Sequence, residues 1–306
     1  MKIKLGDYNN LKIVKSVDFG LYLDGGDEGE ILLPARYVPQ NYKIGDELEV
    51  FIYLDQDERP VATTLHPFAK VGEFAYLEVA WVNEFGAFLD WGLMKDIFCP
   101  FREQKMRMLK GNHYIVYITI DEESYRIMAT AKVDKYLQSL LPDENNNLSV
   151  SNKDTETEQT PETEARQTAH IYSHGDAVDL LIWQKTDLGF KAIVDGKYQG
   201  LIYDDQVFQP LHTGDKVTGY IDHVRTDGKI DLTVQPTGRK QTEEFSEVLL
   251  HYLQENGGYC ELGDKSDSEL IRDRFKVSKK VYKRAIGDLY KRHLISITDD
   301  GIRLNP

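Results

Sequence analysis

The sequence predicts a mainly β protein with an α+β tail, and three observations carry that prediction. Short alternating strands recur three times around a glycine, at Gly20, Gly86 and Gly189. From Thr242 the apolar period changes from about two residues to about 3.6, which is typical of helices. The final stretch, 294–304, consists of two short apolar runs around an Asp-Asp-Gly turn, which favours a β-hairpin. We therefore expect three small β domains followed by a helical domain that ends in a hairpin.

The second repeat shows the β pattern most fully. Alternation places Leu77, Val79 and Trp81 on one face of its first strand. The next strand begins at a turn in which Phe85 and Phe88 flank the glycine. A third short strand, a basic connection and two further strands joined by an acidic turn complete the repeat. Five short strands with this spacing predict a small closed barrel of the OB type.

The repeats divide the chain into five segments. We assign five-stranded OB barrels to residues 1–65, 66–136 and 171–238, and the helical tail to residues 239–306. We assign residues 137–170 to a flexible linker, because residues 143–170 are acidic, polar and almost without apolar side chains. Glycine suits the recurrent position because tight corners often require a positive φ, which other residues adopt reluctantly.

The tail has the helix signals of a winged-helix domain. Asn256-Gly257-Gly258 closes the first helix, Ser266 to Glu269 reads as a capping box that opens the second, and Ser278 caps the third. The apolar positions of the first helix are Phe245, Val248, Leu249 and Tyr252, and those of the third are Tyr282, Ala285, Ile286 and Leu289. Three helices and the terminal hairpin predict a winged helix.

The charge of the chain is unevenly distributed. The net charge of −14 at pH 7 argues at face value against a nucleic-acid partner. By segment, the net charge in chain order is −5, −1, −5, −4 and +1. The second barrel and the tail are therefore near neutral, and each carries a local basic cluster. This distribution is compatible with weak, local RNA contact.

The sequence also indicates a cellular compartment. The first ten residues lack the apolar stretch of a secretion signal, and no apolar run approaches the roughly 18 residues of a membrane-spanning helix. Cys99 and Cys260 lie far apart, and neither belongs to a CxxC pair. We expect a cytoplasmic protein with two free thiols and no membrane segment.

Two sets of residues carry a resemblance to known proteins. In the tail they are Asn256-Gly257-Gly258, Asp264-Lys265-Ser266, Ser278-Lys279-Lys280 and the segment from Ala285 to Lys291. In the third repeat they are Leu188-Gly189-Phe190-Lys191 and the segment from Tyr198 to Tyr203. With this domain order, the chain resembles the conserved virulence factor B (CvfB-like) family of bacterial RNA-binding regulators. Its barrels resemble S-one-type domains, named after a ribosomal protein. The resemblance implies single-stranded RNA as the partner.

Phe85 and Phe88 are the leading candidates for RNA contact. The resemblance implies that they lie on the ligand face of the second barrel, where S-one-type domains stack bases. Exposed aromatic rings offer flat faces to bases, and each stack contributes ~1–3 kcal/mol. The alternative is that one or both rings fill the barrel core. Phe19 and Tyr22 hold the corresponding positions in the first barrel, where acidic neighbours weaken the attraction of phosphates.

Basic residues accompany the candidate aromatic pair. The connection before the fourth strand of the second barrel carries Arg102, Lys105, Arg107 and Lys110. Arg126 precedes the last strand, at a position where the resemblance implies an RNA contact. These cations would guide a phosphate backbone towards the aromatic face. The alternative is that they belong to a solvated loop.

The third barrel and the tail give weaker signals. Leu188 and Lys191 replace the aromatic pair in the third barrel, which favours protein contact or internal packing. In the tail, Asp299 and Asp300 occupy the wing tip, where a DNA-binding wing usually offers a cation, so duplex DNA is an unlikely partner. Auxiliary RNA contact or domain packing explains the basic stripe of the third tail helix equally well. The stripe consists of Lys279, Lys280, Lys283, Arg284 and Lys291.

The sequence has no signature of catalysis. The motifs GxxxxGK[ST], GxGxxG, GxSxG and HExxH are absent. We therefore expect a protein that is not an enzyme and needs no cofactor or metal. The favoured function is RNA binding with a regulatory role, exerted by occupancy. Two alternatives stay open: a protein-interaction scaffold that uses the first and third barrels, and a winged-helix transcription regulator that binds DNA.

Overall fold

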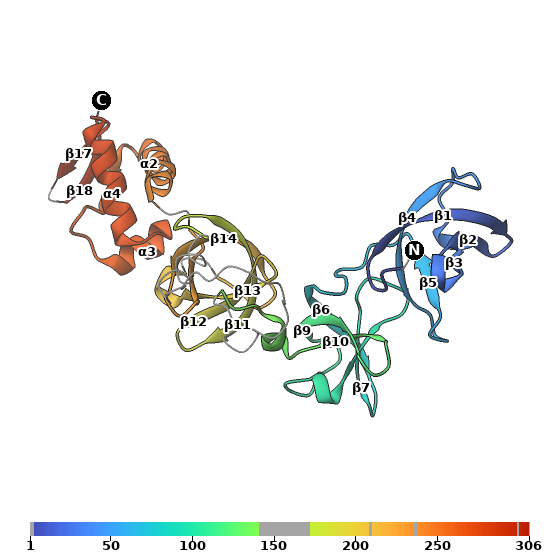
Figure 1. The fold of residues 1–306 in the computed structure, drawn as a ribbon. Coiled ribbons are helices and arrows are strands. Elements are labelled where there is room, and N and C mark those ends of the chain that lie inside the picture. The colour runs from blue at the N-terminus through green and yellow to red at the C-terminus, as the bar shows by residue number, and fades with distance from the viewer. Residues whose placement is uncertain (1–2, 141–171, 208–209, 236–237, 299, 306) are drawn as a thin grey trace, which may run out of the picture. The chain divides into compact units, whose positions relative to one another are not determined.

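The computed structural model describes residues 3–140, 172–207, 210–235, 238–298 and 300–305 (Figure 1). The chain forms two compact units, Met1–Tyr136 and Leu137–Pro306. Unit 1 contains two β-barrels, and unit 2 contains a third barrel and the tail domain. Most of the predicted linker, residues 141–170, lies outside the described residues.

Each barrel is a closed sheet in which the strands follow the order first, second, third, fifth, fourth. Neighbouring strands are antiparallel, except that the third and fifth run parallel. This is the predicted OB topology. The first barrel consists of β1 Tyr8–Val17, β2 Gly20–Asp24, β3 Glu30–Pro34, β4 Glu47–Leu54 and β5 Pro60–Thr63. The second consists of β6 Phe74–Val82, β7 Gly86–Leu89, β8 Ile97–Pro100, β9 His113–Ile120 and β10 Ile127–Thr130. The third consists of β11 Ala177–Thr186, β12 Gly189–Val194, β13 Tyr198–Tyr203, β14 Lys216–Val224 and β15 Ile230–Thr233.

The recurrent glycine is required by a close approach between two strands. A Cβ atom on Gly86 would lie 2.4 Å from the carbonyl oxygen of Cys99, and one on Gly189 would lie 2.0 Å from that of Ile202. Gly20 meets its neighbouring strand in the same way. Because such distances are steric clashes, any side chain here would push the second strand away from the third. Strand packing is thus the constraint that the three glycines share, whereas the positive φ expected at a corner is found at Gly20 and Gly189 but not at Gly86.

A β-bulge interrupts the first strand of each barrel and changes which face its later residues occupy. In β6 the pairing shifts between Val79, opposite Leu89, and Trp81, opposite Phe88. Leu77 and Val79 are buried, whereas Trp81 is exposed. The prediction that these three residues share one face is therefore wrong, because the extra residue of a bulge reverses the alternation.

The two barrels of unit 1 share a hydrophobic core. Phe51 and Tyr53 of β4 and Val61 of β5 belong to the buried cluster of the second barrel. Phe51 is fully buried and meets Trp91 edge to face, with ring centroids 5.8 Å apart. The indole N–H of Trp91 donates to the carbonyl oxygen of Lys95 at 2.7 Å, so this buried ring has a partner for its polar atom. The two barrels therefore pack as one body.

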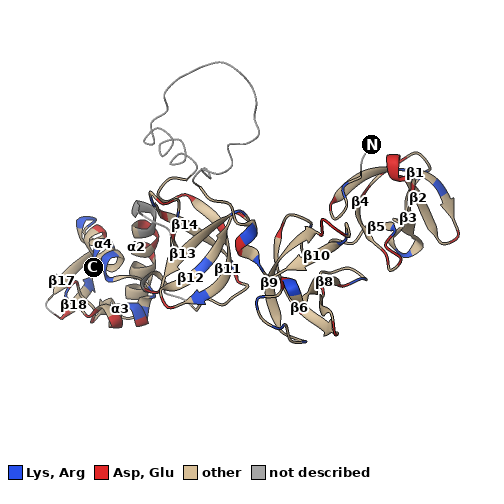
Figure 2. Ribbon diagram, turned by 60° about the horizontal axis from the view of Figure 1, so that its bottom comes forward, with Lys and Arg blue, Asp and Glu red and all other residues tan. Residues whose placement is uncertain are grey.

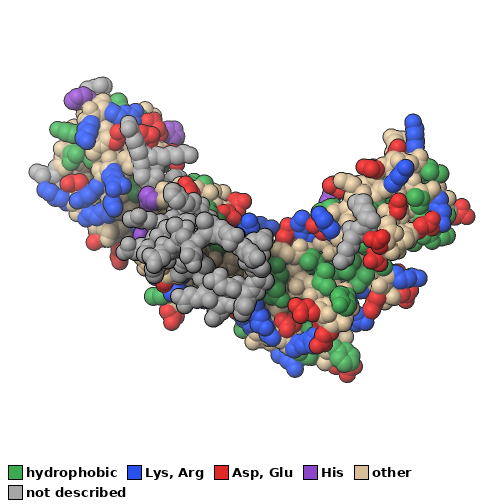
Figure 3. Space-filling view, viewed as in Figure 1, with side chains coloured by type: hydrophobic (Ala, Val, Ile, Leu, Met, Phe, Trp, Pro, Cys, Tyr) green, Lys and Arg blue, Asp and Glu red, His purple; other side chains and the backbone are tan. Residues whose placement is uncertain are grey.

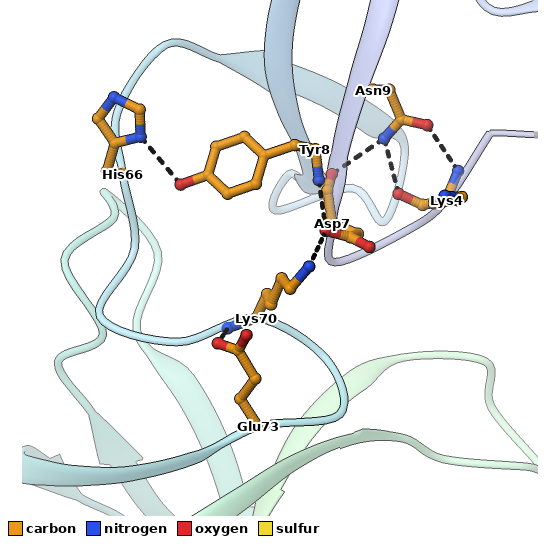
Figure 4. Close-up of polar contacts among 7 residues, drawn as sticks. All are labelled: Lys4, Asp7, Tyr8, Asn9, His66, Lys70 and Glu73. Carbon is orange, nitrogen blue, oxygen red and sulfur yellow. Dashed lines mark hydrogen bonds and ion pairs between the residues drawn. The ribbon is translucent and has the colours of Figure 1, made fainter. Parts of the chain in front are cut away.

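Polar contacts surround this junction (Figure 4). The hydroxyl of Tyr8 and Nδ1 of His66 lie 2.9 Å apart, and Nζ of Lys70 donates to Oδ1 of Asp7 at 2.9 Å. Burial opposes ionisation of Asp7, but the hydrogen bond and charge of Lys70 outweigh it and hold the pKa of this carboxyl below its ordinary value. Because Asp7 stays charged at neutral pH, the ion pair ties the first barrel to the segment that enters the second.

Residues 137–140 belong to the third barrel, which corrects the predicted start of the linker at 137. The backbone N–H of Gln138 donates to the carbonyl oxygen of Lys197 at 2.8 Å, and Gln138 forms a parallel bridge with Tyr198. Leu140 is buried in the core of the third barrel. Burial of Leu140 among apolar side chains holds this segment against the barrel.

Unit 2 ends in the predicted winged helix. The sheet of this domain has three strands, in the order β16, β18, β17, so the predicted hairpin gains a third strand. The elements are α2 Gly238–Glu255, β16 Tyr259–Cys260, α3 Ser268–Phe275, α4 Lys279–Lys291, β17 Ile295–Thr298 and β18 Gly301–Leu304. Within the described residues, no helix is long and apolar enough to cross a membrane.

The helix caps of the tail agree with the sequence in part. Ser278 caps α4 and accepts from the N–H of Val281 at 3.3 Å, as predicted. In α3 the cap is Asp267 rather than Ser266, because the Asp267 carboxylate accepts from the N–H of Glu269 at 2.7 Å. Val248, one of the apolar positions that mark the first tail helix, is exposed.

We expect Phe51→Ala to destabilise both barrels of unit 1 together. Removing a buried ring costs ~3–5 kcal/mol, and the cavity would open beside Trp91 of the second barrel. Urea unfolding followed by tryptophan fluorescence should show a lower midpoint. Phe68→Ala, at an exposed phenylalanine of the same unit, should leave the midpoint nearly unchanged. An unmoved transition at Trp91 in Phe51→Ala would contradict the shared core.

Candidate nucleic-acid interface

Three aromatic rings form a row across the outer face of the second barrel. Trp81 on β6 pairs with Phe88 on β7, and Phe88 pairs with Phe98 on β8. The rings of Trp81 and Phe88 stack with centroids 3.7 Å apart and planes 4° apart, and Phe98 lies 4.8 Å from Phe88. None of these three rings belongs to the buried core of the barrel. This geometry excludes the alternative in which Phe88 fills the core.

A ligand can reach the outer rings of the row, Trp81 and Phe98, but not the faces of the middle ring, Phe88. Phe88 lies between Trp81 and Phe98, so neighbouring rings occupy both of its faces. Trp81 is 43% exposed, and its indole N–H donates to Oδ2 of Asp96 at 2.9 Å, which fixes the orientation of the ring. A base can therefore stack on Trp81, while Phe88 supports that ring from below.

Phe85 lies in the turn before β7, and its side chain is 65% exposed. Oδ1 of Asn83 accepts from the backbone N–H of Phe85 at 2.8 Å and from that of Gly86 at 3.0 Å. The carbonyl oxygen of Phe85 accepts from the N–H of Phe101 at 3.1 Å. The backbone is thus anchored while the ring stays in solvent, so Phe85 is not a core residue and is accessible to a base.

The aromatic face borders a cleft of about 720 Å³ in unit 1. The second barrel contributes Phe85, Phe88 and Phe98 to its lining, and the β4–β5 hairpin of the first barrel contributes Gln56 and Glu58. This volume lies within the range of small-molecule sites. Figure 3 shows hydrophobic side chains gathered on unit 1 beside both acidic and basic ones. The cleft is therefore amphipathic, with ring faces and charged edges.

The arginines of the cleft are held in ion pairs. Arg102 donates to the carboxylate of Asp121 at 2.6 Å. Arg126 pairs with Glu58 of the first barrel. Both cations line the cleft, but each already has a carboxylate partner. A phosphate must compete with these carboxylates, because paired charges leave only a weak field outside the pair.

The other predicted cations lie on the connection beside the cleft. The guanidinium of Arg107 lies over the ring of Phe101, 3.4 Å from its centroid. Lys105 pairs with Asp134, and Lys110 is exposed. The structure thus separates the predicted basic cluster into Arg102, which lines the cleft, and three cations outside its lining.

In the first barrel, an ionic arrangement replaces the aromatic stack. Lys15 stands where the second barrel has a tryptophan, and its Nζ lies 4.5 Å from the ring centroid of Tyr22. Lys15 also pairs with Glu30 at 2.5 Å. Phe19 is exposed and meets Tyr22 edge to face at 6.2 Å. The predicted pair Phe19 and Tyr22 is thus on the surface, but a lysine and a carboxylate lie beside it.

The third barrel lacks the aromatic row. Its corresponding residues are Gln184, Lys191 and Leu201, and Nζ of Lys191 lies 5.3 Å from the ring centroid of Trp183. Leu188 is exposed at the position of the second barrel's exposed phenylalanine. A cleft of about 560 Å³ adjoins this face. Leu188, Lys191 and Leu201 line it in place of a stacking pair, and Tyr198 is the one aromatic residue of its lining.

The basic stripe of the tail lies on α4, where Lys and Arg are marked blue in Figure 2. Lys280, Lys283, Arg284 and Lys291 are exposed, and Lys279 is half-buried. At the wing tip, Asp300 is exposed, while Asp299 lies outside the described residues. The stripe is therefore accessible, next to a wing that carries at least one exposed acidic residue.

Sequence reasoning missed three residues of this site. Alternation from Ile97 to Cys99 could have placed Phe98 outward, opposite Phe88. The exposure of Trp81 was hidden by the bulge, which alternation alone does not reveal. The contribution of Glu58 depends on how the two barrels pack, and no local sequence signal indicates that.

Known proteins match both ends of the chain. Residues 5–65 match the family model of the S1 domain, and residues 247–304 match that of the CvfB-like winged helix domain. Protein YitL of Bacillus subtilis (strain 168) is 28% identical over 291 residues, covering 94% of this chain and 89% of the relative. Conserved virulence factor B of Staphylococcus aureus (strain N315) is 23% identical over 266 residues, covering 86% and 80%. The predicted resemblance to the CvfB-like family is thereby confirmed.

A solved multidomain protein with nucleic acid binding domains from Streptococcus pneumoniae is 20% identical and covers 98% of both chains, with a TM-score of 0.41. So loose a superposition supports no comparison of sites. The S1 domain is the finding that indicates nucleic-acid binding. The S1 domain match falls on the first barrel, whereas the aromatic row lies on the second. The family match and the candidate binding residues are therefore on different barrels of unit 1.

Proposed function

We propose that this CvfB-like chain binds single-stranded RNA in the cytoplasm, on the second barrel and in the adjoining cleft, and regulates by occupancy rather than by catalysis. One observation carries the proposal: two exposed rings, Phe85 and the Trp81 ring that stacks on Phe88, lie beside a cleft that contains Arg102 and Arg126. Ring faces accept any base, and guanidinium groups donate to phosphate oxygens.

Single strands fit this surface better than duplexes. In a duplex each base is already stacked on its neighbours, so only an unpaired strand can place a base on Phe85 or Trp81. Gln56 and Ser124 also line the cleft and offer hydrogen-bonding groups to a ribose 2′-hydroxyl. These groups favour RNA over single-stranded DNA.

The charge balance of the cleft sets the expected mode of binding. Arg102 and Arg126 are paired with Asp121 and Glu58, so each new phosphate contact is made at the expense of an ion pair. Few counterions are then released on binding, and the affinity should depend weakly on salt. Stacking therefore supplies most of the specificity for single strands, which is consistent with a net charge of −14.

Protein contact is the second candidate function, and it concerns the third barrel. Leu188 is exposed beside a cleft of about 560 Å³ that also contains Lys191 and Arg225. Aliphatic, charged and amide side chains outnumber Tyr198, the single aromatic residue of the lining, so the cleft suits a peptide better than a stacked base. The first two barrels would then hold RNA while the third recruits a protein.

We expect Phe85→Ala and Trp81→Ala each to lower RNA affinity by ~1–3 kcal/mol, the value of one stack, and the double variant by roughly 2–5 kcal/mol. Phe88→Ala should weaken binding through the lost support of Trp81. The slope of log affinity against log salt should barely change, because the rings carry no charge. Anisotropy of a labelled oligouridylate at two salt concentrations measures both quantities.

Phe68→Ala is the matched control for these variants, since this ring is 63% exposed in the same unit but does not line the cleft. It should bind RNA as the wild type does. Melting temperatures near that of the wild type would show that the alanine variants are folded. Wild-type affinity in a folded Phe85→Ala/Trp81→Ala variant would remove the second barrel as the RNA site.

Glu58→Gln should strengthen RNA binding several-fold. The change removes the carboxylate that pairs with Arg126, so the arginine becomes available to phosphate. The salt slope should steepen by up to ~0.7, the value for one phosphate contact of a single strand. Glu28→Gln, at an exposed glutamate of the same barrel outside the cleft lining, is the charge-matched control. Equal affinities for the two variants would contradict competition between Glu58 and RNA.

Reversing charge on α4 with Lys280→Glu and Arg284→Glu should weaken RNA binding modestly and leave duplex DNA binding negligible. Both side chains are exposed, but the wing carries Asp300 in place of a phosphate-binding cation. Filter binding with homopolymer RNA and with duplex DNA compares the two ligands. A nanomolar, sequence-specific duplex site in the full chain would favour the transcription regulator instead.

A further inference from the structure

A second exposed ring stands on the loop between β9 and β10 of the second barrel. Tyr125 is 73% exposed, more than Phe85 on the loop between β6 and β7. Its side chain makes no hydrogen bond or ring contact with any other described residue. In OB barrels these two loops flank the ligand face. The ring therefore contributes nothing visible to packing, yet it stands at the edge of the candidate site.

The backbone at Tyr125 is in the left-handed region, with φ of 57°. The corresponding loop of the third barrel carries Gly228 with φ of 77°, and that of the first carries Glu58 with φ of 65°. Glycine adopts this conformation without steric penalty, whereas a bulky side chain is disfavoured there. The left-handed conformation at this position therefore costs a tyrosine more conformational energy than it would cost a glycine.

The correspondence between the three loops rests on their hydrogen bonds. Each loop is closed by one bond of 2.9 Å, from the N–H of Asp55, Asp121 or Arg225 to the carbonyl oxygen of Arg59, Arg126 or Lys229. The left-handed residue directly precedes the last of these in every case. In the second barrel, Asp121 also accepts from two backbone N–H groups of the loop. The turn is thus built from backbone groups and Asp121, and the tyrosine ring is dispensable to it.

The neighbours of Tyr125 tie this loop to the cleft. Ser124 and Arg126 line the cleft on either side of it, together with Phe85 from the other loop. The left-handed residue of the corresponding loop in the first barrel, Glu58, also contacts this cleft, because it pairs with Arg126. A disfavoured backbone conformation at a side chain without a packing role, next to two cleft-lining residues, motivates a functional hypothesis for this ring.

We propose that Tyr125 is a second base-stacking residue, which takes the nucleotide next to those held at Phe85 and Trp81. This inference rests on the proposed function of the second barrel. The two loops then hold a single strand between them, with bases stacked at both rims of the cleft and phosphates near Arg126. Binding at both rims requires an oligonucleotide, so a mononucleotide gains nothing from the second ring.

Tyr125→Gly separates this role from a structural one. Glycine relieves the left-handed strain, so the melting temperature should stay the same or rise. The affinity for a labelled oligouridylate of about ten nucleotides should fall about 5- to 150-fold, as for the loss of one stack. Tyr125→Phe keeps the ring and should restore binding. The affinity for uridine monophosphate should be the same in all three proteins.

The outcomes distinguish this inference from the proposed function. Undiminished oligouridylate affinity in Tyr125→Gly, with Phe85→Ala still weakened, would overturn the role of Tyr125 alone. A wild-type chain that does not bind the oligouridylate would overturn both. A Tyr125→Gly variant that melts at a markedly lower temperature would show that the ring stabilises the fold, and would also overturn the inference.

Discussion

The packing of Phe51 and Tyr53 against the second barrel is the interaction on which the candidate site depends. Without it, the two barrels of unit 1 would not share a core. The β4–β5 hairpin of the first barrel would then have no fixed position relative to the second barrel. With it, Gln56 and Glu58 at the tip of that hairpin line a cleft opposite the aromatic row. The apolar junction is enclosed by polar contacts such as that of Lys70 with Asp7, so both barrels contribute to one rigid surface.

The electrostatics of that surface differ from those of a strongly basic nucleic-acid binder. Arg102 and Arg126 are present at the cleft, yet each is neutralised by a carboxylate, one from its own barrel and one from the neighbouring barrel. A surface of this kind attracts polyanions weakly at long range and selects ligands at short range, through shape and stacking.

The three barrels share one topology and differ in the residues that cross the same outer face. The second carries Trp81, Phe88 and Phe98, whereas the first has Lys15 and Tyr22 at the first two of these positions. The third has Gln184, Lys191 and Leu201. The fold is therefore a scaffold, and the chemistry is decided by a few side chains on it. The S1 domain match on the first barrel identifies the scaffold rather than the site.

Local sequence patterns were sufficient for the architecture. Alternation, the recurrent glycine and the change from a period of two to a period of 3.6 predicted three OB barrels and a winged helix, because these signals depend on contacts close in sequence. For Phe85 they left core packing open; the resemblance to S-one-type domains implied a place on the ligand face, and the side chain is exposed. The linker boundary at 137 was wrong because the burial of Leu140 depends on a barrel that is formed by residues much later in the chain.

Tertiary structure alone decided how the site is composed. A bulge of one residue turned Trp81 outward, and strand pairing then placed it on Phe88. The pairing of Arg126 with Glu58 joins residues from two barrels, so neither local sequence could indicate that the cation is already neutralised. The amino-acid sequence by itself determined which elements form and which aromatic and basic residues are available. Their stacking, their charge state and their shared cleft were fixed only by long-range packing, because those properties belong to pairs of residues that the fold brings together.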